Sequence, residues 1–193
     1  MKKYSIYLLI PILFIIPISL YFGSYLPWKK AQNVINAMRN GQAARSLDAF
    51  KAAYAPLLNS RSPVGEDEAL KQLITMSFGA VSDPNAPKEV VEELVKFVAS
   101  YVEPAVAKGS GAGFVQYHYV MGSLYARMGL QHKDVAYLEK AERLFKDGLV
   151  LSPTRPQFYY GLFDIYNQGG RQKDAEVIAQ KILEYWPKGF DIQ

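Results

Sequence analysis

The C-terminal part of the chain repeats one spacing of residues every 34 positions. Pro153 and Pro187 are 34 residues apart, as are Ala141 and Ala175, and each alanine precedes its proline by 12 residues. Proline ends helices because it lacks a backbone N–H, and small residues are needed where two helices cross closely. The spacing therefore predicts an all-α array of helical hairpins that stack on one another.

Each predicted repeat has large residues on its first helix and small residues on its second. The final repeat combines Tyr159, Leu162, Phe163 and Tyr166, a turn at Gln168–Gly170, and Ala175, Ala179 and Ile182. The preceding repeat combines His118, Met121, Gly122 and Tyr125, a turn at Gly129, and Ala141, Phe145 and Gly148. Because Gly122 and Ala141 are 19 residues apart rather than about 12, we expect a lengthened connection between the two helices within 130–140. A weaker third copy carries Gly41, Ser46, Phe50 and Ala53.

This pattern resembles the tetratricopeptide repeat, a 34-residue unit of two antiparallel helices. The stretches 27–54 and 134–170 are also similar to the region that follows the last membrane helix of bacterial O-antigen ligase/polymerase-like proteins. Those proteins have many membrane helices before this region, whereas a single apolar segment precedes it here, so none of that family's catalytic residues can be carried over. The second resemblance implies that the repeats lie outside the bacterial cytoplasmic membrane.

The N-terminal segment is long enough to cross a membrane. From Tyr4 to Leu26 there are 23 residues without a charge, and a helix of that length spans roughly 34 Å. Aromatic residues cluster at both ends of the segment, where amphipathic rings favour the membrane interfaces. No two small residues have the spacing of a signal-peptide cleavage site, so we expect an uncleaved single-pass anchor, with a cleaved signal as the alternative. Lys2 and Lys3 on one side and Lys29 and Lys30 on the other leave the orientation open.

The expected fold is therefore an N-terminal transmembrane helix followed by a tetratricopeptide-type helical-hairpin solenoid. We divide the chain into an anchor at 1–28, a degenerate first repeat at 29–60, an irregular helical insert at 61–113 and two repeats at 114–193. Within the insert we expect helices at 66–78 and 88–108, with a loop at 82–87 between them. Pro104 is expected to bend the second helix or to begin a new one, and the glycine-rich run 109–113 reads as a hinge.

Composition argues against several function classes. The net charge is +4, and without Lys2 and Lys3 the basic excess is only two residues, which is too small for a nucleic-acid footprint. The chain has no cysteine and two histidines, His118 and His132, neither with a plausible metal-binding neighbour. We find no catalytic constellation and no cofactor motif, and we interpret His118 as a residue of the repeat core. The sequence predicts a protein that is not an enzyme.

A binding groove is the remaining candidate site. In tetratricopeptide arrays the first helices of the repeats line a concave surface, and the resemblance implies that this surface binds a protein or peptide. The groove residues carried over by position are Gln116, Tyr119, Ser123 and Arg127 from one repeat and Gln157, Tyr160, Asp164, Asn167 and Gln168 from the next. Tyrosines supply rigid contact area, and amides can bond a peptide backbone.

The expected function is that of a membrane-anchored interaction module, in an envelope polysaccharide assembly or at the cell surface. Two alternatives stay open. The chain could be a detached part of an O-antigen ligase-like enzyme that works with a separate membrane domain. It could also be a repeat-type assembly factor for secretion or pili.

Overall fold

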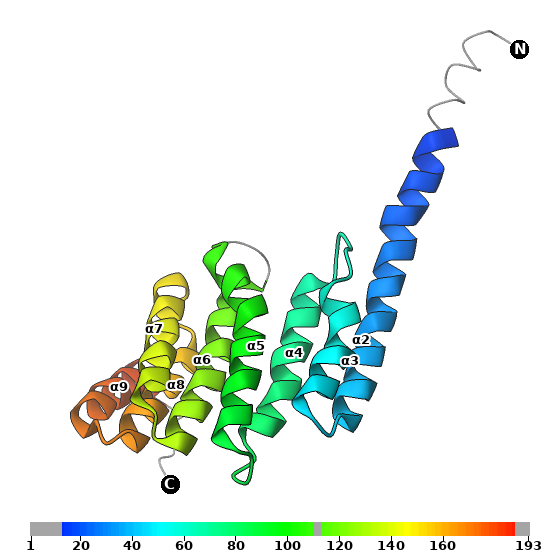
Figure 1. The fold of residues 1–193 in the computed structure, drawn as a ribbon. Coiled ribbons are helices and arrows are strands. Elements are labelled where there is room, and N and C mark those ends of the chain that lie inside the picture. Colours follow the sequence, from blue (N-terminus) through cyan, green and yellow to red (C-terminus); the bar gives the residue numbers. More distant parts are fainter. Residues whose placement is uncertain (1–12, 110–112, 188–193) are drawn as a thin grey trace, which may run out of the picture. The chain divides into compact units, whose positions relative to one another are not determined.

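The computed structural model describes residues 13–109 and 113–187, and all regular structure within these ranges is helical (Figure 1). The all-α prediction is therefore confirmed for the described part of the chain. The chain divides into two compact units, residues 1–72 and 73–193, with the boundary inside one helix, α4 (Glu66–Val81). The four-segment division expected above stays a prediction.

The chain is helical without a break from residue 13 to residue 43. Within this stretch Tyr21–Tyr25 form the π-helical element η1, in which the backbone N–H of Leu26 donates to the carbonyl of Tyr21. Pro27, which follows, has no N–H to donate, and its ring crowds the carbonyl four residues earlier, inside η1. A local widening of the helix relieves this crowding, as π-bulges commonly do.

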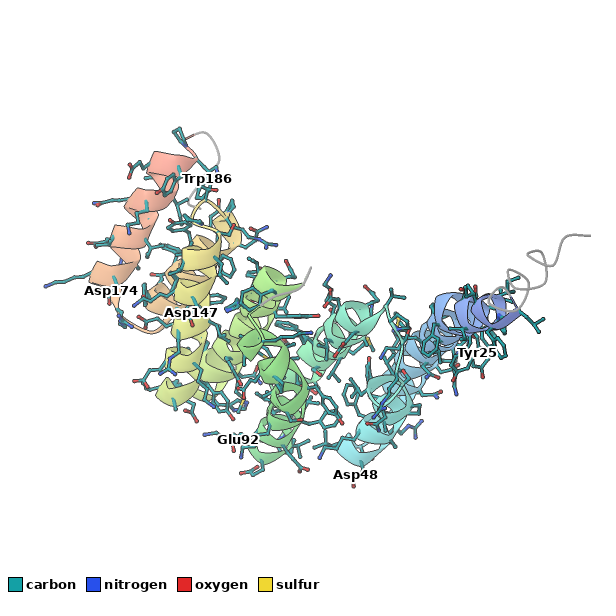
Figure 2. All side chains as sticks on the ribbon, turned by 90° about the horizontal axis from the view of Figure 1, so that it is seen from above. Tyr25, Asp48, Glu92, Asp147, Asp174 and Trp186 are labelled. Carbon is teal, nitrogen blue, oxygen red and sulfur yellow. The ribbon has the colours of Figure 1, made fainter. Side chains whose placement is uncertain are left out.

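The side chains of residues 13–28 are mostly exposed and apolar, and Figure 2 shows them around Tyr25. Among the described residues, however, no helix is long and apolar enough to qualify as a membrane span. Residues 4–12 of the expected span lie outside the described ranges.

The first unit is built on a hairpin of α2 (Leu26–Ala43) and α3 (Leu47–Leu58). Ser46 begins α3 as its N-cap, because its hydroxyl accepts from the backbone N–H of Ala49. Gly41 lets the helices approach, since a Cβ built there would come 2.8 Å from Cε2 of Tyr54. These are residues of the weak first repeat copy, and they do place two helices in contact.

Lys30 lies in the interior of this first unit rather than at a membrane flank. Its Nζ donates to the carbonyl of Leu57 at 3.1 Å and to that of Ser60 at 2.9 Å. The last carbonyls of a helix have no partner within the helix, so a lysine at this place satisfies them and suits the helix dipole. Of the two lysines expected beside the membrane, only Lys29 is exposed.

The second unit begins within α4, whose C-terminal half contributes Leu73, Ile74 and Val81 to the core. A loop at 82–87 leads to α5 (Lys88–Ala107), as expected. Pro104 lies inside α5 and the helix continues past it to Ala107, so it does not begin a new helix. Residues 110–112 of the expected hinge lie outside the described ranges, and the neighbouring Gly109 has a positive φ of 71°.

The expected long connection within 130–140 is wrong. Helix α6 runs from Phe114 to His132 and α7 from Val135 to Leu151, so only Lys133 and Asp134 separate them. Lys133 adopts the left-handed conformation that ends α6, and the Asp134 carboxylate accepts from the N–H of Ala136 to begin α7. The extra residues therefore lengthen both helices instead of forming a loop.

Gly129, expected in the turn, is also inside α6. A Cβ built on it would come 2.6 Å from Cδ2 of Leu138, so this glycine allows α6 and α7 to pack closely near the end of the hairpin. Small residues serve helix crossings as well as turns, and a lone glycine in a sequence does not distinguish the two roles.

The last hairpin consists of α8 (Pro156–Gln168) and α9 (Gln172–Tyr185), joined at Gly169 and Gly170 as predicted. Helices α7 and α9 end two residues before Pro153 and Pro187, which confirms the role of these prolines. Ala141 and Ala175 are buried, as their place at close helix crossings requires. The core of this unit centres on Phe145 and Phe158, which are also buried.

Candidate functional site

The nine predicted groove residues lie on two helices that contact each other, α6 and α8. On each helix they recur every three or four positions and so share one face. Arg127 and four α8 residues, Gln157, Asp164, Asn167 and Gln168, are exposed. The other four, Gln116, Tyr119, Ser123 and Tyr160, are half-buried. None of the nine is fully buried, so all retain some accessible surface.

Tyr119 and Ser123 are the members most tied to the fold itself. The ring of Tyr119 lies 6.4 Å from that of Phe145 and 6.1 Å from that of Phe158, centroid to centroid. The Ser123 hydroxyl donates to the carbonyl of Tyr119 at 2.8 Å. These two residues form the floor of the predicted groove, resting on the aromatic core beneath it.

One end of the predicted groove is closed by a side chain that the sequence did not single out. The guanidinium of Arg155, the residue before α8, donates to the side-chain oxygen of Gln116 on α6. Arg155 also lies over the ring of Phe158, 5.9 Å from its centroid. This pairing links α6 and α8 and occupies the carbonyl of Gln116, leaving its amide N–H groups for other partners.

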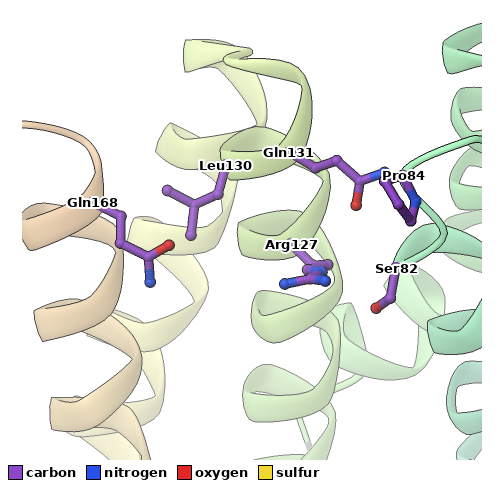
Figure 3. A pocket seen from close by; sticks show the side chains of 6 residues that line it. All are labelled: Ser82, Pro84, Arg127, Leu130, Gln131 and Gln168. Carbon is purple, nitrogen blue, oxygen red and sulfur yellow. The ribbon is translucent and has the colours of Figure 1, made fainter.

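The other end of the groove opens into a hollow of about 260 Å³ (Figure 3). Two predicted groove residues meet there, Arg127 from α6 and Gln168 from α8. The rest of the lining was not predicted, namely Leu130, Gln131, Ser82 and Pro84. The first two continue the groove face of α6 by one more turn, and the last two come from the loop between α4 and α5.

The loop is held against α6 by a direct hydrogen bond. Nε2 of Gln131 donates to the carbonyl of Asp83 at 2.9 Å. At the far end of the same hairpin, Nζ of Lys88 lies 3.2 Å from Oδ2 of Asp134 and so ties the start of α5 to the start of α7. The loop wall of the hollow is therefore positioned by residues on either side of it.

Two charged groups on this face have no ion-pair or hydrogen-bond partner among the described residues. They are the guanidinium of Arg127 and the carboxylate of Asp164, which lies one turn before Gln168 on α8. Although Asp164 is exposed, partial burial raises the pKa of its carboxyl above the ordinary value of 3.8. A cationic ligand group would offset that cost and lower the pKa again.

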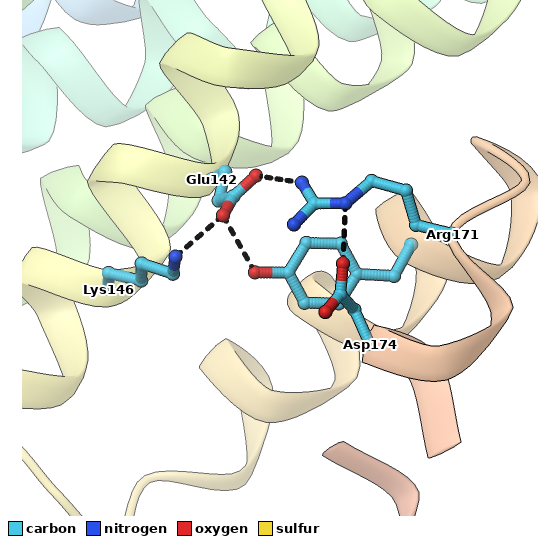
Figure 4. Close-up of polar contacts among 5 residues, drawn as sticks. Glu142, Lys146, Arg171 and Asp174 are labelled. Carbon is cyan, nitrogen blue, oxygen red and sulfur yellow. Dashed lines mark hydrogen bonds and ion pairs between the residues drawn. The ribbon is translucent and has the colours of Figure 1, made fainter. Parts of the chain in front are cut away.

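A separate polar cluster joins α7, α8 and α9 and centres on Glu142 (Figure 4). The Glu142 carboxylate accepts from Lys146 at 2.6 Å, from the Tyr166 hydroxyl at 2.8 Å and from Arg171 at 2.5 Å. Arg171 also bonds Asp174 at 2.6 Å and covers the ring of Tyr166, 4.3 Å from its centroid. Every charge in the cluster is paired, which is the arrangement of a structural network that joins helices.

Hydrogen bonding sets the charge state of Glu142. Partial burial alone would raise the pKa of its carboxyl, but the bonds from Lys146, Tyr166 and Arg171 outweigh burial and hold the pKa below the usual 4.5. The carboxylate is thus ionised at neutral pH and is engaged on three sides. It is poorly suited to general acid–base chemistry, which needs a group that exchanges protons near the working pH.

His118 lies in the interior of α6, with Nδ1 donating to the carbonyl of Phe114 at 3.0 Å. Its ring also meets that of Phe114 edge to face, at 4.8 Å between centroids. This is the packed core histidine that the repeat register predicts. Within residues 13–109 and 113–187 no three His, Cys, Asp or Glu side chains gather as a metal site would need.

The lining residues that sequence reasoning missed fall into two kinds. Leu130 and Gln131 share the three-to-four-residue spacing of Arg127, and they were overlooked because this stretch was read as a connection. Ser82 and Pro84 are 40 or more residues away along the chain, and no local pattern brings them to α6.

Comparisons with known proteins leave this site without a precedent. No protein-family model matches the chain. Searches of the curated proteins and of the solved structures likewise give no match.

Proposed function

We propose that this protein is a membrane-anchored tetratricopeptide-type interaction module that holds an extended segment of another protein in the groove between α6 and α8. The observation that carries the proposal is the exposed polar face of these two helices, which ends in a hollow lined from three elements. Half-buried tyrosines beside free amides are typical of surfaces that bind extended peptides.

The 34-residue spacing supports the repeat assignment. It places Ala141 and Ala175 at equivalent buried positions of two successive hairpins, with a proline two residues after the end of each second helix. A stack of hairpins buries one continuous core and leaves its first helices to form a binding face. The contact between α6 and α8 agrees with that arrangement.

The N-terminal helix supports a membrane anchor. Leu13, Phe14, Ile15 and Ile16 are consecutive and all exposed, so apolar side chains cover every side of this helix. Water does not favour such a surface, whereas lipid does. We propose that residues 4–26 cross the cytoplasmic membrane once and that the helical repeats lie outside it, as the resemblance to O-antigen ligase-like proteins implies.

The anchor is tested by fractionation and mass spectrometry. The full chain is expected to remain in the membrane pellet after alkaline washing and to retain its N-terminus. A mature protein that starts anywhere between Ser19 and Lys30 would contradict the anchor and favour a cleaved signal peptide.

The groove is tested by capturing partners from detergent-solubilised membranes with the full chain. Tyr160→Ala is expected to weaken capture of a specific partner by about 1–2 kcal/mol, as truncated aromatic contact residues do. Tyr185→Ala, which removes an exposed tyrosine from α9 outside the groove, serves as the control. If both variants capture the partner as well as the unchanged protein does, the partner binds elsewhere and the groove assignment is wrong.

A further inference from the structure

The charges on the groove face are arranged along one line. Asp164 and Gln168 are one helical turn apart on α8, which corresponds to about 6 Å along the helix axis. Gln168 shares the hollow with Arg127. The face therefore presents a negative group, and then, about one turn further on, a positive group beside an amide.

The hollow matches one side chain better than a whole small molecule. Its volume of about 260 Å³ is below the range of roughly 300–1,000 Å³ typical of small-molecule sites. Arg127 and the amides of Gln131 and Gln168 line it as hydrogen-bond donors, and Leu130 adds an apolar wall. Donors around a positive centre favour a carboxylate, and the apolar wall suits the methylene groups that carry it.

Asp164 favours a cation at the neighbouring position. No described residue neutralises its carboxylate, and partial burial makes that charge costly. In an extended chain, side chains on one side are two residues apart and separated by about 6.6 Å, close to the separation of one helical turn.

We propose that the groove selects an extended segment with the pattern acidic–any–basic, in which the acidic side chain enters the hollow beside Arg127 and the basic side chain pairs with Asp164. This inference rests on the proposed function and adds the charge pattern of the partner to it. The intervening residue points away from the face, so its identity is unconstrained.

The test is selection from a randomised hexapeptide library with both ends capped, using the full chain in detergent at low ionic strength. The unchanged protein is expected to enrich peptides with an acidic and a basic residue two positions apart. Arg127→Gln is expected to lower the preference for the acidic residue about three- to tenfold, and Asp164→Asn to lower that for the basic residue similarly. Arg127→Glu is expected to reverse the preference to a basic residue at that position.

Matched controls separate the groove from general surface charge. Arg143→Gln and Asp147→Asn remove exposed charges from α7 and are expected to leave both preferences unchanged. Enrichment of peptides without the charge pattern would overturn this inference while supporting the groove itself. If no peptide is enriched, the inference and the proposed peptide-binding function both fail.

Discussion

Gly122 on α6 lies directly against the ring of Phe145 on α7, such that a Cβ on this glycine would come 2.7 Å from Cε1 of the ring. Gly161 on α8 approaches the opposite edge of the same ring, and a Cβ there would come 2.7 Å from Cε2. The ring is fully buried between the two glycines. It therefore has no room to move away from either of them.

We expect Gly122→Ala to destabilise the fold by about 1–3 kcal/mol, because the added methyl overpacks a rigid core. The same change at Gly79, an exposed α4 position with nothing within 4 Å of the added Cβ, should stabilise by up to about 1 kcal/mol through helix propensity. Thermal or chemical unfolding of both variants is the measurement. In a Phe145→Leu background the cost of Gly122→Ala is expected to shrink, since the overlapping ring atoms are gone. Equal costs in the two backgrounds would contradict the packing described here.

Gly122 and Phe145 also show how far the sequence alone could lead. The 34-residue spacing identified Ala141, Phe145 and Gly148 as buried packing residues, and each is buried. Such positions are predictable because helix periodicity and residue size determine which side chains can occupy a close crossing. Gly161 was not identified, because its role depends on the ring of a residue from the previous hairpin.

A second prediction concerns Lys30, whose buried Nζ donates to two carbonyls at the end of α3. Lys30→Met keeps most of the side-chain length but leaves those carbonyls without a donor, so we expect a loss of about 1–3 kcal/mol in the free energy of unfolding. Lys29→Met changes an exposed neighbour and is expected to have little effect. A Lys30→Met protein as stable as the Lys29→Met control would show that the carbonyls find other partners.

The third prediction is a pH dependence that originates at Glu142. Its folded-state pKa is lowered from the usual 4.5, so the unfolded chain binds the proton more readily than the folded chain. The network therefore contributes its full stability above about pH 4.5 and loses it as the pH falls through the lower, folded-state pKa. We expect Glu142→Gln to cost about 1–3 kcal/mol at pH 7 and to flatten the acid-side decline in stability.

Glu139→Gln is the matched control for this titration. Glu139 is an exposed carboxylate one turn away on the same helix, and none of the hydrogen bonds to Glu142 involves it. Unfolding curves at several pH values between 3 and 7 compare the two variants with the unchanged protein. An acid-side slope that is the same for both variants would mean that Glu142 does not set it.

The candidate site was less predictable than the core. Arg127 and Gln168 could be placed on one face from helix periodicity, and the structure brings them to one hollow. Ser82 and Pro84 could not be, because their approach depends on a tertiary hydrogen bond between Gln131 and Asp83. The two-residue turn between α6 and α7 was missed for a related reason: the left-handed conformation of Lys133 is uncommon for lysine, and no turn residue such as glycine marks it.

That turn gives the last prediction. Lys133 has a φ of 53°, where a side chain with a Cβ is strained by roughly 1–2 kcal/mol and glycine is not. We therefore expect Lys133→Gly to stabilise the protein by about 0.5–1 kcal/mol, the strain relief being partly offset by the greater freedom of glycine in the unfolded chain. Lys181→Gly, at an exposed position within α9, is expected to destabilise by about 0.5–1 kcal/mol because glycine is a poor helix former. Opposite shifts in unfolding midpoint for the same substitution would establish Lys133 as the residue that ends α6, whereas a loss of stability in both variants would restore a longer, helical or irregular connection at this place.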